Sequence, residues 1–123
     1  MTELTLRIEL FPTQMDRFVD FYTRVLRFRL VRDERDATFP YVSVERGSVH
    51  IGASKAWEQT EPRHRRPETG VEIVLEVDDV EAEERSVTEA GWPLEQPITL
   101  QPWGLRDFRL LDPDGYFLRI TTR

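Results

Sequence analysis

The sequence predicts an α+β fold of paired βαβββ modules, with a curved mixed sheet around a cup and helices on its outer face. The chain has 123 residues, enough for one domain or for two small halves that share a core. A strand pattern followed by a helix pattern occurs twice. Residues 7–10 align with residues 72–75, and residues 15–16 with 80–81, without a gap. This internal repeat favours two copies of one unit, because a single unit leaves one sheet face uncovered.

The first half begins with a predicted strand and helix. Residues 4–11 alternate between apolar and other side chains, which predicts a half-buried strand with Leu4 and Leu6 on its apolar face. Thr13 and Asp16 resemble a capping signal, and apolar residues at helical spacing predict a helix over residues 14–27. Further strands are expected near residues 28–33, 40–45 and 48–53.

The second half repeats this order. Residues 71–77 alternate as a strand, Asp78 and Glu81 suit the start of a helix, and Gly91 suits its end. Near the C-terminus, two alternating runs flank a turn formed by Asp-Pro-Asp-Gly at residues 112–115. We therefore expect a single domain over 1–123, with module one at 1–55, a linker at 56–69 and module two at 70–123.

Composition excludes several functions. There is no cysteine, so disulfides, thiolate nucleophiles and cysteine-ligated metals are excluded. The net charge is −6 and the pI is near 5.0, which argues against a nucleic-acid partner and agrees in sign with a cationic one. The polar start of the chain has no apolar signal segment, so we expect a cytoplasmic protein without a membrane partner.

Several segments resemble one known superfamily. Residues 16–17 and 21–28 are similar to the first helix and following strand of the vicinal oxygen chelate superfamily, which includes glyoxalase I, extradiol dioxygenases and bleomycin resistance proteins, although Arg27 stands where glycine is usual. Residues 76–82 resemble its second strand-to-helix junction, and residues 112–116 its last hairpin. The segment Gln101-Pro102-Trp103-Gly104 resembles the bleomycin resistance proteins most closely.

The resemblance implies metal-ligand positions that this chain fills differently. Enzymes of the superfamily hold a divalent metal with one residue from each of four strands. The matching positions are Arg7, Glu72, Arg119 and either His50 or Gly52. Because a guanidinium is permanently protonated and has no lone pair, the two arginines cannot ligate, and we expect neither metal nor cofactor.

The resemblance therefore favours a homodimeric protein that binds a small molecule without metal, with sequestration of a bleomycin-class antibiotic as its leading form. Whether a reaction is catalysed stays open. The alternatives are a metal-dependent lyase or dioxygenase using Glu9, His50 and Glu72, or a metal-free isomerase using Glu9 and Glu72. For Arg7, Glu72 and Arg119, a structural charge ladder between strands is weighed equally with ligand binding. No catalytic or metal-binding residue is predicted, and the candidate ligand-binding residues are Arg7, Glu9, Phe11, Tyr41, His50, Trp57, Glu72, Trp103, Phe117 and Arg119.

Overall fold

The structure is a computed structural model that describes residues 4–56, 65, 67 and 69–123. The chain divides into two compact units, residues 1–59 (unit one) and residues 60–123 (unit two). Among the described residues, none of the helices is both long and apolar enough to span a membrane.

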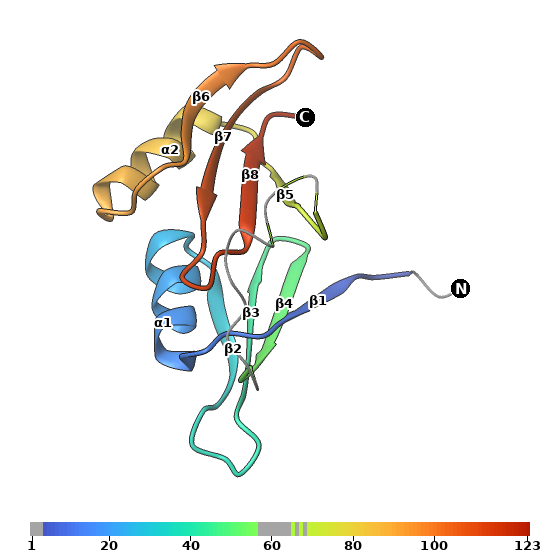
Figure 1. The fold of residues 1–123 in the computed structure, drawn as a ribbon, viewed down its shortest axis with the longest axis vertical. Helices are drawn as coiled ribbons and strands as arrows, with labels where there is room; N and C mark the ends of the chain where they lie inside the picture. The colour runs from blue at the N-terminus through green and yellow to red at the C-terminus, as the bar shows by residue number, and fades with distance from the viewer. Residues whose placement is uncertain (1–3, 57–64, 66, 68) are drawn as a thin grey trace. The chain divides into compact units, whose positions relative to one another are not determined.

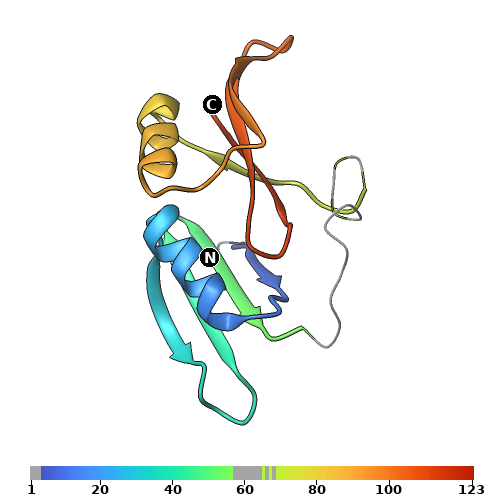
Figure 2. The same cartoon turned by 60° about the vertical axis from the view of Figure 1, so that its left-hand side comes forward.

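Unit one is a four-stranded mixed sheet with one helical segment on a single face (Figure 1; Figure 2). The strand order is β1-β4-β3-β2, in which β1 runs parallel to β4 and the other pairs are antiparallel. The core between helix and sheet includes Phe18, Tyr22, Val44 and Ile51, all nearly inaccessible to solvent. The elements are β1 (Arg7–Leu10), α1 (Met15–Asp20), η1 (Phe21–Val25), β2 (Arg29–Glu34), β3 (Tyr41–Arg46) and β4 (Val49–Ser54).

The first strand is shorter than the alternating pattern predicts. Its ladder to β4 begins where Arg7 lies beside His50, and Leu4 and Leu6 precede this point. Both leucines are therefore exposed, Leu6 at 71%, rather than packed on the core. The alternation of residues 4–11 correctly predicted which side chains of β1 share a face, but it did not predict where the strand starts. Leu4 and Leu6 are exposed because burial also requires a neighbouring strand.

The first helix changes its hydrogen-bond spacing after one and a half turns. It continues from α1 into the π-helix η1, and together they occupy most of the predicted range 14–27. Arg27 then follows with φ of 60°, a left-handed conformation that favours glycine. This geometry explains why glycine is usual at this position in the superfamily that the sequence resembles.

Unit two repeats the same plan. Its elements are β5 (Ile73–Glu76), α2 (Val80–Glu89), β6 (Gln96–Leu100), β7 (Arg106–Leu111) and β8 (Phe117–Thr121). The strand order β5-β8-β7-β6 copies that of unit one, again with a parallel first pair. Asp79, rather than the predicted Asp78, caps α2 by accepting a hydrogen bond from the amide of Ala82 at 3.0 Å. The predicted βαβββ repeat and the α+β class are confirmed.

The strand registers establish which positions correspond in the two units. Glu9 lies beside Gly52 and Gly52 beside Ser43 in unit one. In the same order, Val74 lies beside Arg119 and Arg119 beside Arg109 in unit two. Cross-strand neighbours project to the same side of a sheet, so each row lies on one face. In both units this is the face opposite most of the buried apolar side chains, and it is called the open face.

Candidate functional site

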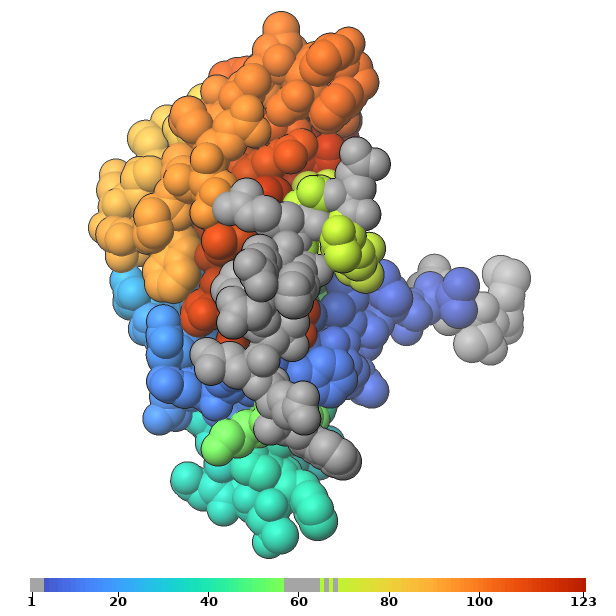
Figure 3. Space-filling model, viewed as in Figure 1, coloured from blue at the N-terminus to red at the C-terminus, as the bar shows by residue number. Residues whose placement is uncertain are grey.

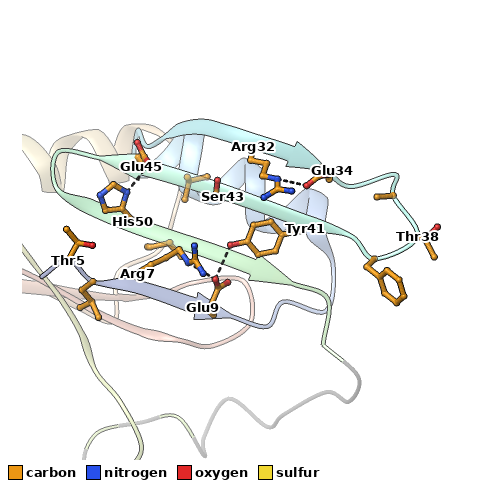
Figure 4. A pocket seen from close by; sticks show the side chains of 15 residues that line it. Thr5, Arg7, Glu9, Arg32, Glu34, Thr38, Tyr41, Ser43, Glu45 and His50 are labelled. Atoms are coloured by element: carbon orange, nitrogen blue, oxygen red, sulfur yellow. Dashed lines mark hydrogen bonds and ion pairs between the residues drawn. The ribbon is translucent and has the colours of Figure 1, made fainter. Parts of the chain in front are cut away.

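A pocket of about 860 Å³ lies over the open face of unit one (Figure 4). Its size falls within the range of small-molecule sites, roughly 300–1,000 Å³. Strands β1, β3 and β4 form its floor, β2 lies along one side, and the loop that joins β2 to β3 contributes its rim. Its polar lining consists largely of charged side chains, and the lining includes Arg7, Glu9, Arg32, Glu34, Phe39, Tyr41, Ser43, Glu45 and His50.

The Glu9 carboxylate is held in place by two neighbours. Its Oε1 atom accepts one hydrogen bond, from the Tyr41 hydroxyl at 3.0 Å, and forms an ion pair with Arg7 Nε at 2.8 Å. Its Oε2 atom is buried and has no hydrogen-bond partner among the described residues. A buried carboxylate oxygen without a donor is costly, so a hydrogen-bond donor that reaches this atom would relieve that cost.

Gly52 provides the space that this arrangement needs. A Cβ atom at this position would lie 2.1 Å from the Tyr41 hydroxyl and 2.4 Å from Glu9 Oε2. Such separations are impossible without movement of the two side chains. A glycine in a central strand weakens the sheet, and here it makes room for a hydrogen-bonded pair on the open face.

The environment of Tyr41 keeps its hydroxyl protonated. Burial raises the pKa of Tyr41, and the hydrogen bond to Glu9 and the negative charge of Glu9 raise the pKa further. The positive charges of Arg7 and Arg32 oppose this shift. Arg32 also lies over the Tyr41 ring, with its Cζ atom 5.6 Å from the ring centroid. Tyr41 is thus a fixed donor toward Glu9 at neutral pH.

A carboxylate and an imidazole are paired at the other end of the pocket. His50 Nδ1 lies 2.9 Å from Glu45 Oε1, and the two residues are directly opposite each other on β4 and β3. Figure 4 shows this pair and the Arg32–Glu34 ion pair, which lies on β2 at the side of the pocket. Glu45 orients the imidazole ring, and the second ring nitrogen has no protein partner among the described residues.

The open face of unit two carries a different set of charges. Arg119 pairs with Glu72, with 3.3 Å between its Nη2 atom and Glu72 Oε1, and their side chains are only 23% and 20% exposed. The guanidinium also lies 5.8 Å from the centroid of the Trp103 ring. Arg119 Nε and Glu72 Oε2 are buried without partners among the described residues.

Two further polar residues of this face lie on β7. Arg109 is directly opposite Arg119, and its buried Nε atom has no partner in the described chain. Asp107, two residues earlier, is completely buried. Its Oδ1 atom accepts a hydrogen bond from Gln101 Nε2 at 2.9 Å, whereas Oδ2 has no partner among the described residues.

The structure divides the predicted site residues between the two units. Arg7, Glu9, Tyr41 and His50 line the pocket of unit one. Phe11 lies just beyond β1, is half exposed and does not line this pocket. In unit two, Glu72 and Trp103 are both in contact with Arg119, and Phe117 is buried on β8. Trp57 lies outside the described residues.

Several open-face residues were missed by the sequence analysis. They are Arg32, Ser43 and Glu45 in unit one, and Asp107 and Arg109 in unit two. The sequence of residues 106–111 carried a signal, because the charged residues Asp107 and Arg109 alternate with the apolar residues Phe108 and Leu110. Recognising them as site residues required the register of β7 against β8.

The side chains present do not fit the metal centre that the fold implies. Arg7 and Arg119 occupy two of the implied ligand positions, and each is paired with a glutamate. The described residues contain no group of three or more His, Asp or Glu side chains placed to hold a metal ion.

Comparisons with known proteins agree with this fold. TioX from Micromonospora sp. ML1 is 26% identical, with 98% of each chain covered and a TM-score of 0.79. A superfamily member from Sphaerobacter thermophilus is 21% identical over 99% of this chain and 98% of its own, with a TM-score of 0.74. The fosfomycin resistance protein FosX from Mesorhizobium loti is 16% identical, covering 100% and 94%, with a TM-score of 0.73. A search of curated proteins finds no match.

A family model spans almost the whole chain. It matches residues 5–120 and so includes every described helix and strand of both units except the last residue of β8. The repeated βαβββ topology and the similar solved structures support the same assignment. The chain belongs to the glyoxalase/bleomycin resistance protein/dioxygenase superfamily.

Proposed function

We propose that the protein binds a small polar organic molecule in the pocket of unit one, without the use of a metal. The observation that carries this proposal is the Glu9 carboxylate, which Arg7 and Tyr41 hold in the pocket while the buried Oε2 atom lacks a hydrogen-bond donor among the described residues. A preorganised acceptor binds a ligand donor at lower entropic cost than a mobile one. The two arginines at the implied ligand positions support binding over metal chemistry.

The lining indicates the chemical character of the ligand. The free oxygen of Glu9 favours a hydrogen-bond donor, and a cationic donor most strongly. Glu34 and Glu45 add negative charge, while Tyr41 and the exposed Phe39 offer aromatic surface at the pocket. An organic cation with a flat ring system satisfies both features.

Sequestration of an antibiotic of the bleomycin class, by a homodimer, is the specific form that we propose. The family assignment and the net charge of −6 support it, because a cationic drug is attracted to an acidic protein. In this form the protein holds the drug stoichiometrically and releases it unchanged.

The test is a calorimetric titration of the purified protein with metal-free bleomycin and with a panel of aromatic amines. We expect saturable binding that the Glu9→Gln variant weakens about tenfold, since a charge-assisted hydrogen bond is lost. Glu89→Gln, at an exposed position on α2, is the matched control and leaves affinity unchanged.

Each outcome decides part of the proposal. If the amines bind and bleomycin does not, the antibiotic assignment is refuted, but the pocket remains a small-molecule binding site. Failure of the whole panel, or equal affinity for the wild type and Glu9→Gln, would refute the pocket itself. Recovery of the bound drug by mass spectrometry tests the absence of a reaction, because a changed mass contradicts sequestration.

Metal-free proton transfer is a second candidate, favoured by the Glu45–His50 pair. A carboxylate that fixes one imidazole nitrogen prepares the other to accept a proton. For each ligand found by titration, exchange of its C–H protons in D₂O is followed by NMR. Exchange that His50→Gln abolishes while binding persists supports an isomerase, and the lack of exchange contradicts one.

A further inference from the structure

We propose that the open face of unit two is a second binding site, specific for the carboxylate of a small aromatic acid. Arg109 and Arg119 hold the carboxylate, and Trp103 contacts the ring. This site is formed by unit two alone and does not depend on the pocket of unit one or on the function proposed for it.

The pairing of Arg109 with Arg119 is the central observation. They are directly opposite each other on β7 and β8, so two guanidinium groups project from neighbouring positions on one face. Like charges placed in this way destabilise a sheet. Glu72 offsets one of the two charges by its ion pair with Arg119, and no ion pair offsets Arg109 within the described residues.

The unpartnered donors specify an anion with more than one acceptor atom. The Nε atoms of both arginines are buried and lack acceptors among the described residues. A guanidinium offers planar, parallel N–H donors that match the two oxygens of a carboxylate. A single bound carboxylate therefore supplies acceptors to both arginines and neutralises the excess positive charge.

Two neighbouring carboxylates restrict the charge of the ligand that this site can bind. Asp107 Oδ2 and Glu72 Oε2 are buried without donors in the described chain, and Asp107 is entirely inaccessible to solvent. Negative charges at these positions disfavour a highly charged anion such as phosphate. They favour a singly charged acid over a multiply charged one.

Trp103 provides the surface for an aromatic ring. Its side chain lies beside Arg119, and the residue is 56% exposed, so much of its surface is open to a ligand. Exposed tryptophans that border a charged group are well suited to bind an amphipathic ring. A ligand that bridges Arg109 and Trp103 must therefore carry its carboxylate on or near an aromatic system.

The experiment titrates the protein with benzoate and follows the ¹⁵Nε–Hε signals of Arg109 and Arg119 by NMR. We expect saturable shifts of both signals, and an affinity for benzoate about tenfold higher than for acetate. Arg109→Gln weakens benzoate binding about tenfold or more, because half of the guanidinium pair is lost. Arg85→Gln, at an exposed position on α2, is the control and leaves affinity unchanged.

Two further variants distinguish the parts of the proposal. Arg109→Lys retains the charge without the planar donors and is expected to bind benzoate more weakly than the wild type. Trp103→Leu reduces affinity for benzoate and spares that for acetate. Unchanged benzoate affinity in a folded Arg109→Gln or Arg109→Lys variant overturns the site, and equal affinities for benzoate and acetate overturn the role of Trp103. Tighter binding of inorganic phosphate than of benzoate refutes the ligand class.

Discussion

The two units have the same strand order and corresponding registers, yet their open faces carry different chemistry. In the row where unit one has Glu9, Gly52 and Ser43, unit two has Val74, Arg119 and Arg109. Unit one leaves space above Gly52 and fills it with a hydrogen-bonded pair. Unit two places two arginines in the same row. The buried faces preserve the fold, and the open faces are free to diverge because they do not form the core.

The largest expected effect comes from filling the space above Gly52. Gly52→Ala forces Tyr41 and Glu9 apart and is expected to lower the free energy of unfolding by about 1–3 kcal/mol, which urea denaturation measures. The cost is expected to shrink in a Tyr41→Phe background, where the closest clashing atom is absent. Equal costs in both backgrounds would show that Tyr41 does not require the glycine.

The arginine pair of unit two predicts opposite effects from the same substitution. Arg119→Met leaves Glu72 without its partner and is expected to lower the free energy of unfolding by about 1–2 kcal/mol, less than for a fully buried ion pair because both side chains are partly exposed. Arg109→Met removes an unpaired charge and is expected to be neutral or stabilising. Parallel urea denaturation curves test this, and similar losses in both variants contradict the assigned pairing.

The helix ends offer a smaller comparison. Arg27 and Gly91 both follow a helix with positive φ, 60° and 81° respectively. Arg27→Gly is expected to raise the free energy of unfolding, and Gly91→Ala to lower it, each by about 1 kcal/mol. A Cβ at Gly91 meets no atom within 4 Å, so this cost is purely conformational. Thermal denaturation measures the stability change of each variant. Changes of the same sign would contradict the explanation that positive φ favours glycine at both positions.

The smallest expected effect is the pH dependence of stability that arises from Tyr41 in unit one. Because the pKa of Tyr41 is raised in the folded protein, its contribution to stability is fully present below the pKa of the unfolded chain, near 10. It is lost as the pH rises through the folded pKa. Glu9→Gln is expected to lower the pKa of Tyr41, and ¹³C NMR of labelled tyrosine rings measures the shift. An unchanged pKa in this variant would exclude Glu9 as a cause.

The internal repeat predicted the fold well because it depends on local patterns. Every strand expected in unit one is present close to its expected residues, although β1 starts late and the first helix ends in a π-helical turn. The predicted caps were wrong, because α1 begins after Gln14 without a side-chain cap and Asp79, not Asp78, caps α2. The side-chain contacts on the open faces were harder to predict from the sequence. Tyr41 and Glu9 were both named from the sequence, but their contact depends on Gly52, whose role appears only when β1, β3 and β4 are placed in register. Arg109 was missed for the same reason.

The most direct test of metal-independent function is Mn²⁺ titration of ¹⁵N-labelled protein, followed by paramagnetic broadening of the amide signals. Because arginines fill the implied ligand positions, one equivalent of Mn²⁺ is expected to cause no saturable, localised broadening around Arg7, His50, Glu72 or Arg119. Saturable broadening centred on Glu9, His50 and Glu72, and abolished by Glu72→Ala, would contradict the account and establish a metal centre.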